Sequence, residues 1–104
     1  MADCLFCKII QGDIPTQKVY EDNDVFAFHD IHPKARVHIL IVPKKHIPTA
    51  MDVTREEEVL MGKLIRSAYE VSKEFGLLGY RLQVNVGQHG GQEIFHLHFH
   101  LLGD

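Results

Sequence analysis

The chain has few cysteines, no excess of basic charge and no long apolar run. Cys4 and Cys7 are the only cysteines among its 104 residues, which excludes a small scaffold held together by several disulfides. The formal net charge is −3, so the sequence lacks the basic surface of a nucleic-acid-binding protein. The longest apolar run, "ILIV" at 39–42, is too short to cross a bilayer. We therefore expect neither a nucleic-acid partner nor a membrane partner.

The length and composition are those of one small globular domain over residues 1–104. The chain is 45% hydrophobic and 24% charged, which is close to ordinary globular values. Because a chain this short has little stability to spare, we expect it to form a homodimer. Asp3 and Cys4 stand where a secretory signal would need its apolar stretch, which predicts a cytoplasmic location.

Five segments have the composition of β-strands. They are rich in β-branched or aromatic residues and are bounded by turn residues. They cover residues 18–22, 24–30, 36–43, 80–86 and 93–102. Asn23, between the first two, suits a tight turn between antiparallel strands.

Two segments have helical patterns. A short helical start at 2–12 ends at Gly12. A long helix begins near Thr54, because Thr54 and Glu57 form a capping-box pair, and it ends at Gly76. Its apolar stripe has helical spacing and consists of Leu60, Leu64, Ala68, Val71 and Phe75. Met61 and Ile65 widen this stripe, either for the core alone or also for a partner. Together the segments predict an α+β fold, with a mainly antiparallel five-stranded sheet, one long helix and a short N-terminal helix.

The chain ends on "HLHFHLLGD", residues 96–104, in which three of its eight histidines alternate with apolar residues. In a strand, alternate side chains share one face, so His96, His98 and His100 would share a face with Ile94. The other face would carry Phe95, Leu97, Phe99 and Leu101. Three interpretations remain open from the residues alone. They are a plain polar sheet face, a metal site, and a nucleophilic site in which an imidazole attacks phosphorus beside the glycine loop "GQHGGQ" at 87–92.

The segment "HLHFHLL" fits the His-φ-His-φ-His-φ-φ signature (φ, apolar) and resembles the histidine triad, or HIT, superfamily. The stretches "GYRLQVNVGQHGGQEIFHLHFHLLG" and "FHDIHPKARVHILIVPKKHIP" are similar to its HINT-like branch of nucleotide-binding phosphoramidases. The likeness runs from about Leu5 to Gly103. The "LLG" after the triad favours this branch over the branch of dinucleoside polyphosphate hydrolases.

This resemblance implies an enzyme that hydrolyses the P–N bond of purine nucleoside 5′-phosphoramidates and requires no cofactor for catalysis. His98 matches the histidine that becomes a nucleotidyl-histidine intermediate. His100 matches the histidine that contacts the phosphate and the leaving group, and His38 matches the one that assists proton transfer. The implied partners are purine nucleotides (AMP, GMP and their phosphoramidates) and a second copy of the chain. The alternatives are a dinucleoside polyphosphate hydrolase and a nucleotide-sensing interaction module with residual activity.

The resemblance also implies a set of nucleotide-binding residues. Asp30 would accept hydrogen bonds from the ribose hydroxyls, and Gly91, Gln92 and Asn85 would lie near the phosphate. Glu93 stands where some members carry serine, so it bears on the choice of leaving group. The implied set is Phe6, Phe28, His29, Asp30, Ile31, Asn85, Gly91, Gln92, Glu93 and Ile94. HINT-like proteins usually continue in a tail that reaches across the dimer, and because this sequence ends at Asp104 we expect a more open leaving-group side.

Cys4 and Cys7 form a C-x-x-C pair for which the residues alone leave a redox dithiol, free thiols or a metal site open. Some HIT proteins bind structural zinc through an N-terminal C-x-x-C, a histidine after the "VPK" strand and the first triad histidine. The resemblance therefore implies a zinc site at Cys4, Cys7, His46 and His96, with the tetrahedral set of two sulfur and two nitrogen ligands.

Overall fold

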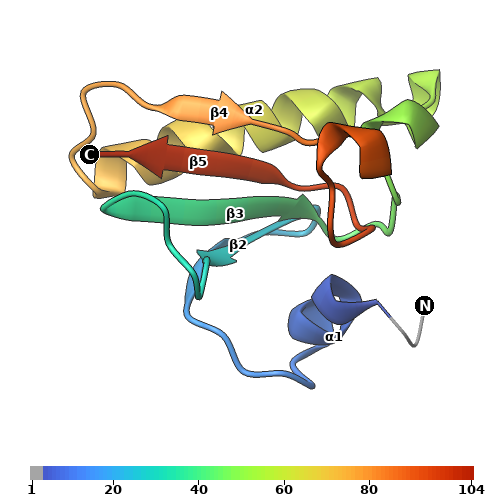
Figure 1. The fold of residues 1–104 in the computed structure, drawn as a ribbon, viewed down its shortest axis with the longest axis horizontal. Coiled ribbons are helices and arrows are strands. Elements are labelled where there is room, and N and C mark those ends of the chain that lie inside the picture. The colour runs from blue at the N-terminus through green and yellow to red at the C-terminus, as the bar shows by residue number, and fades with distance from the viewer. Residues whose placement is uncertain (1–3) are drawn as a thin grey trace.

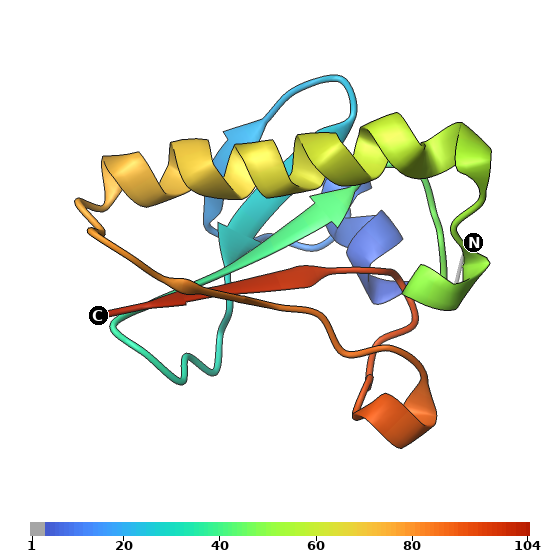
Figure 2. The ribbon, with the colours of Figure 1, turned by 90° about the horizontal axis from the view of Figure 1, so that it is seen from above.

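The computed structural model describes residues 4–104, which form a sheet with a helix on each face (Figures 1 and 2). Residues 1–3, and with them the beginning of the helical segment predicted from residue 2, lie outside the described residues. The elements in chain order are α1 (Leu5–Gln11), β1 (Lys18–Glu21), β2 (Val25–His29), β3 (Val37–Pro43), the 3₁₀ turns η1 (Ala50–Asp52) and η2 (Arg55–Glu57), α2 (Glu58–Glu74), β4 (Arg81–Gln83), η3 (Gln88–Gly90) and β5 (Phe99–Gly103).

The five strands lie in the order β1-β2-β3-β5-β4, and every neighbouring pair is antiparallel. The predicted α+β class, the five-stranded antiparallel sheet and the two helices are therefore confirmed. β3 and β5 are central neighbours, and their register sets Leu40 opposite His100 and His38 opposite Leu102. Because opposite residues of an antiparallel pair share a face, His38 and His100 lie on the same side of the sheet.

Two apolar clusters cover the two faces of the sheet. The α2-side cluster contains Leu64, Ala68 and Val71 of the predicted stripe, packed with Val25, Ala27, Val37, Ile39, Ile41, Ile47, Leu97 and Leu101. The α1-side cluster contains Phe6, Ile9, Phe26, Phe28, Leu40 and Val42. Each fully buried side chain of this kind stabilises the fold by about 1.5–3 kcal/mol. The central strands that carry His38 and His100 therefore have an apolar cluster on each face.

The long helix begins and ends close to the predicted residues. Thr54 N–H donates to Glu57 Oε1 at 2.7 Å, and the reciprocal contact to the Thr54 hydroxyl completes the predicted capping box. The box closes the turn η2, so α2 itself starts at Glu58. At the other end Gly76 has φ +67°, a left-handed conformation that glycine adopts at little cost. Among the described residues, 4–104, no helix has both the length and the apolar composition needed to cross a membrane.

The last strand is shorter than predicted. The prediction of a strand over 93–102 is wrong at its start, because β5 begins at Phe99 and the chain bends at 94–96. Two contacts account for the bend. Leu97 N–H donates to Ile47 O at 2.7 Å, and His96 Nε2–H donates to Pro43 O at 2.8 Å. The chain thus bonds to the end of β3 and to the loop that follows it, outside the regular pairing of strands.

This bend changes the predicted faces of the triad segment. Only His100 lies in a strand, so a single strand face shared by all three histidines is wrong. Phe95, predicted on the buried face, is 45% exposed, whereas Leu97 and Leu101 do pack on the α2 side. The bend turns the His96 ring into the interior, where it is fully buried.

One other predicted strand is much shorter in the structure. β4 covers Arg81–Gln83 and not 80–86, because Gln83 pairs with His100 and β5 begins only one residue before His100, at Phe99, so residues 85 and 86 have no partner strand. Between β1 and β2 the predicted turn is confirmed. The carboxylate of Asp22 accepts from the backbone N–H groups of Asp24 and Val25, both at 2.8 Å, and so closes the turn around Asn23.

Candidate functional site

The His98 side chain is held in one tautomer by the backbone. Its Nδ1–H donates to the carbonyl oxygen of His96 at 2.7 Å, and because a carbonyl only accepts, the proton of the neutral ring lies on Nδ1. The ring of Phe6 packs against it edge-on with 5.0 Å between centroids. His98 therefore presents an Nε2 lone pair, which is the electron pair that a nucleophile needs.

His38 and His100 form a pair beside His98. His38 Nε2 lies 2.9 Å from His100 Nδ1 and 3.4 Å from Asp30 Oδ2. The rings of His98 and His100 are 5.0 Å apart between centroids. The structure thus brings together the three histidines predicted to be catalytic and the carboxylate predicted to bind ribose.

The three rings are neutral at ordinary pH because the protein removes water from them. Burial lowers the pKa of His38 and of His98. Burial, followed by the neighbouring His98 and His38, lowers the pKa of His100 to about 4. A neutral imidazole is the form that attacks an electrophile, so burial keeps His98 in its reactive form.

The glycine loop before the triad is ordered by its own hydrogen bonds. The N–H groups of Gly91 and Gln92 donate to Gln88 O at 3.1 Å and to Gly87 O at 3.0 Å. The Gln92 side chain accepts from Gly87 N–H at 2.8 Å and donates to Pro48 O at 2.7 Å and to Ile94 O at 3.0 Å. Gln92 therefore fixes the loop, and its amide group has no hydrogen left for a phosphate.

Backbone donors remain at the end of this loop. Within residues 4–104, the N–H groups of Glu93 and Ile94 donate to no protein acceptor. Asn85, also predicted to lie near the phosphate, accepts from Gln83 Nε2 at 3.2 Å. The donors that the loop offers to an anion are thus the amides after Gln92.

The residues predicted to line the base pocket lie in several surroundings. Phe6 and Phe28 are buried in the α1-side cluster with ring centroids 5.4 Å apart, and Ile94 packs on that cluster. The His29 ring packs edge-on against Phe75 on the α2 side, so the structure does not bring it to the triad. Ile31 is 82% exposed. An open groove of about 550 Å³ runs along Pro15, Thr16, Gln17, His29, Asp30 and Ile31.

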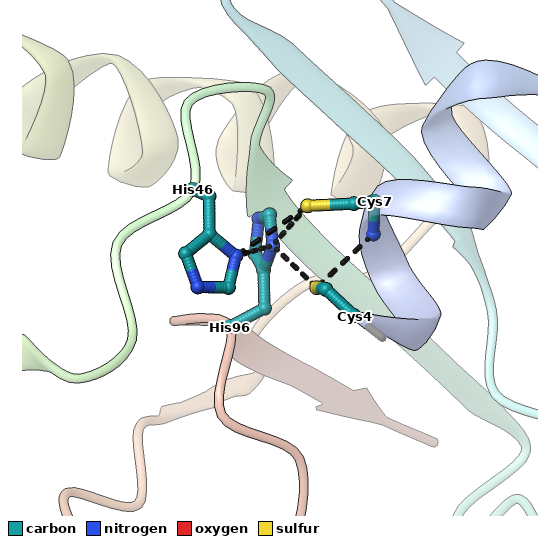
Figure 3. A group of neighbouring side chains, drawn as sticks. All are labelled: Cys4, Cys7, His46 and His96. Carbon is teal, nitrogen blue, oxygen red and sulfur yellow. Dashed lines mark hydrogen bonds between the residues drawn. The ribbon is translucent and has the colours of Figure 1, made fainter. Parts of the chain in front are cut away.

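Cys4, Cys7, His46 and His96 converge from three segments of the chain, as Figure 3 shows: the start of α1, the loop after β3 and the bend before β5. His96 Nδ1 lies 3.3 Å from Cys4 Sγ, 3.6 Å from Cys7 Sγ and 3.3 Å from His46 Nδ1. Cys7 Sγ lies 3.4 Å from His46 Nδ1. The predicted metal residues are therefore neighbours in space.

These distances match the edges of a tetrahedral metal site. With zinc bonds of about 2.0–2.1 Å to nitrogen and about 2.3 Å to sulfur, two nitrogens lie roughly 3.3 Å apart and a nitrogen and a sulfur roughly 3.5 Å apart. His96 Nε2–H is bonded to Pro43 O, which leaves the Nδ1 lone pair facing the sulfurs. Burial and the neighbouring Cys4 raise the pKa of the Cys7 thiol to about 11, so this thiol is protonated until a cation displaces the proton.

Several groups that hold the site were not predicted from the sequence. They are backbone groups: the carbonyls of Pro43 and Pro48, and the Lys34 N–H, which donates to His38 Nδ1 at 3.1 Å. Every residue carries such groups, so no residue type marks them. The prolines of "IVPKKHIP" are the only sequence signal nearby, and they mark the ends of segments.

The fold and the site have close counterparts among known proteins. A model of the HIT domain family matches residues 11–104. The purine nucleoside phosphoramidase of Escherichia coli (strain K12) is 47% identical over 103 residues, covering 97% of this chain and 87% of the relative. Protein HitA of Neisseria gonorrhoeae is 42% identical over 104 residues, covering 99% and 97%.

Solved structures agree with these sequence relatives. The HIT family hydrolase from Legionella pneumophila Philadelphia 1 superposes with a TM-score of 0.95 at 48% identity, covering 97% of this chain and 92% of that one. A histidine triad protein from Clostridium difficile gives a TM-score of 0.97 at 43% identity, covering 100% and 92%. The chain therefore belongs to the HIT domain family of the histidine triad superfamily, and to its HINT-like branch.

Proposed function

We propose that the protein hydrolyses purine nucleoside 5′-phosphoramidates, of the adenosine 5′-monophosphoramidase type, through a nucleotidyl intermediate on His98. The observation that carries this proposal is the bond from His98 Nδ1–H to His96 O, because it leaves Nε2 free to attack. The family supports a hydrolase that binds nucleotides, and the Escherichia coli relative bears the name purine nucleoside phosphoramidase.

In the first step His98 Nε2 attacks the α-phosphorus and the P–N bond breaks. The departing nitrogen accepts a hydrogen bond from His100 Nε2–H, takes a proton from solvent water and leaves as an amine. In the second step water attacks phosphorus, releases a proton to solvent and displaces His98 Nε2. One water is consumed, and the products are the nucleoside monophosphate and the amine. Two-step transfer suits imidazole because it is both a good nucleophile and a good leaving group near neutral pH.

The nucleotide would lie across the groove beside Asp30. The Asp30 carboxylate would accept from the ribose hydroxyls, and Ile31 with the edges of Phe6 and Phe28 would contact the base. The amides of Glu93 and Ile94 would donate to the phosphate, where charge develops in the transition state. The Glu93 side chain is exposed, so it would face the departing amine and favour a cationic one.

The experiment that tests this proposal compares two substrates at equal concentration. Adenosine 5′-phosphoramidate should be converted to AMP with a kcat/KM at least about tenfold above that for diadenosine tetraphosphate. Preferential cleavage of diadenosine tetraphosphate would make the protein a dinucleoside polyphosphate hydrolase. Binding of AMP without turnover of either compound would make it a nucleotide-sensing module.

The low pKa of His100 predicts a distinctive response to pH. Between about pH 6.5, where an unfolded histidine titrates, and pH 4, where folded His100 titrates, the unfolded chain binds more protons. The free energy of unfolding should therefore fall as the pH is lowered from 6.5 toward 4. In the range where the chain stays folded, kcat/KM should remain level through pH 6.5 and decline only at lower pH, because burial also lowers the pKa of the nucleophile His98. A pH profile with its acid midpoint at or above 6.5 would contradict this.

We propose zinc as a structural ligand of Cys4, Cys7, His46 and His96. The support is the tetrahedral spacing of their donor atoms and the sulfur and nitrogen chemistry of the set. The metal would tie α1 to the loops that follow β3 and precede β5. It takes no part in the steps at His98.

We also propose that the protein is a homodimer in the cytoplasm. α2 exposes three large apolar side chains, Val59, Ile65 and Tyr69, which are 73%, 51% and 47% exposed. Ile65 belongs to the widened flank of the predicted stripe, and a partner helix would remove this surface from water. A monomer mass in sedimentation equilibrium at micromolar concentration would contradict the dimer.

A further inference from the structure

The backbone N–H of Lys34 donates to His38 Nδ1 at 3.1 Å. A backbone N–H can only donate, so the Nδ1 of His38 must be the lone-pair nitrogen of the ring. Burial lowers the pKa of His38, so the ring is neutral and carries its single proton on Nε2. The tautomer of His38 is thus set by a group four residues earlier in the chain.

The tautomer of His38 determines the tautomer of His100. His38 Nε2–H points at His100 Nδ1, 2.9 Å away, with Asp30 Oδ2 at the longer distance of 3.4 Å. His100 Nδ1 must then accept, and the proton of His100 lies on Nε2. His98 has the opposite tautomer, with its proton on Nδ1. Neighbouring histidines therefore present different groups, a lone pair on His98 and an N–H on His100.

We propose that the Lys34 amide is a positioning group that fixes His38 and His100 as Nε2–H tautomers, so that His100 always offers an N–H to the departing group. This inference rests on the proposed function. In the first step His100 donates this N–H to the departing nitrogen, and the His38 N–H that it accepts at Nδ1 makes its Nε2–H a stronger hydrogen-bond donor. The Lys34 N–H acts on His38 in the same way. Lys34, His38 and His100 thus form a chain of hydrogen bonds that ends at the Nε2–H of His100.

The bond from the Lys34 N–H to His38 Nδ1 also bears on which side chains bind a metal, because residues 4–104 contain two clusters of metal-ligating side chains. Asp30, His38 and His100 have donor atoms within 4.8 Å of one another, as do the four residues of the zinc proposal. A metal on His38 Nε2 would move the ring proton to Nδ1, where it would face the Lys34 N–H. No such conflict exists at His96, whose Nε2–H has a carbonyl acceptor. The amide thus disfavours a metal on His38.

The tautomers are read directly by long-range ¹H–¹⁵N correlation spectra of the ¹⁵N-histidine-labelled full chain. The inference expects a pyridine-like Nδ1 and a protonated Nε2 for His38 and His100, and the reverse for His98. A protonated Nδ1 on His38 in the wild-type protein overturns it. This reading needs no substrate, so absence of turnover would defeat the proposed function and leave the tautomer result standing.

A pair of variants then tests the amide itself. Lys34→Pro removes the N–H, and Lys34→Ala keeps it while removing the ammonium group. Lys34→Pro should release the His38 ring into a mixture of tautomers and lower kcat at least about tenfold, with a smaller change in KM. Lys34→Ala should keep the wild-type tautomers. Any decrease in kcat that both variants share is due to loss of the Lys34 ammonium group. A folded Lys34→Pro protein with wild-type tautomers overturns the inference, and if that variant does not fold the wild-type spectrum decides.

Discussion

Replacing His98 with alanine is expected to lower the turnover of adenosine 5′-phosphoramidate on the order of 10⁴- to 10⁶-fold. The substitution removes the Nε2 lone pair that the bond from His98 Nδ1–H to the carbonyl of His96 leaves free. Without it no covalent intermediate forms, and only binding and the remaining donors assist hydrolysis. The measurement is AMP release at saturating substrate, followed for hours at a high enzyme concentration.

The fold should survive this substitution, and a matched histidine provides the control. His98 makes two ring contacts, to Phe6 and to His100, and both partners are held by other contacts, so His98→Ala should still bind AMP and unfold cooperatively. His89 is exposed on η3, and His89→Ala should turn over within about twofold of wild type. Comparable rates for His98→Ala and wild type would remove His98 from the mechanism.

The second large effect is expected from Cys7→Ala. Cys7 is buried, and its sulfur lies within 3.6 Å of both His46 Nδ1 and His96 Nδ1. Losing one of four ligands should reduce bound zinc from about one per chain to a small fraction. Because metal binding contributes directly to folding, the free energy of unfolding should fall by at least about 3 kcal/mol.

Loss of the metal should also slow catalysis through His96. The ring of His96 belongs to the cluster, while its backbone carbonyl holds His98 Nδ1. A looser His96 therefore weakens the fixed tautomer of His98. Leu5→Ala, on the same helix and 41% exposed, is the control that should leave metal content unchanged. Wild-type protein purified without added metal and containing far less than one zinc per chain, with Cys7→Ala equally stable, would defeat the zinc proposal.

The sheet and the long helix could be predicted from the sequence because their apolar patterns report burial on one face. The stripe of α2 and the capping box at Thr54 both act locally, so short windows of sequence reveal them. The beginning of β5 could not be found this way. The alternation "HLHFH" is that of a strand, and it is overridden at His96 and Leu97 by the acceptors Pro43 O and Ile47 O, which lie at the end of β3 and in the loop after it, about fifty residues away.

The candidate site could likewise be predicted from the sequence only in part. The histidines and cysteines are recognisable because their side chains carry the chemistry. What each ring presents depends on backbone groups at His96 and Lys34, which no residue type signals. Gln92 is an example. The resemblance to the family places it near the phosphate, yet its side-chain amide is fully hydrogen-bonded to backbone groups of Gly87, Pro48 and Ile94.

The central claim is that His98 Nε2 forms a covalent bond to phosphorus. Its most direct test is rapid acid-free quenching of wild-type enzyme with adenosine 5′-phosphoramidate, followed by mass spectrometry of the peptide that contains 96–104. We predict an adenylyl group on His98 that appears within one turnover, disappears as AMP is released and is absent from His98→Ala. Full turnover with no adduct on His98, or with the adduct on another residue, would contradict the claim.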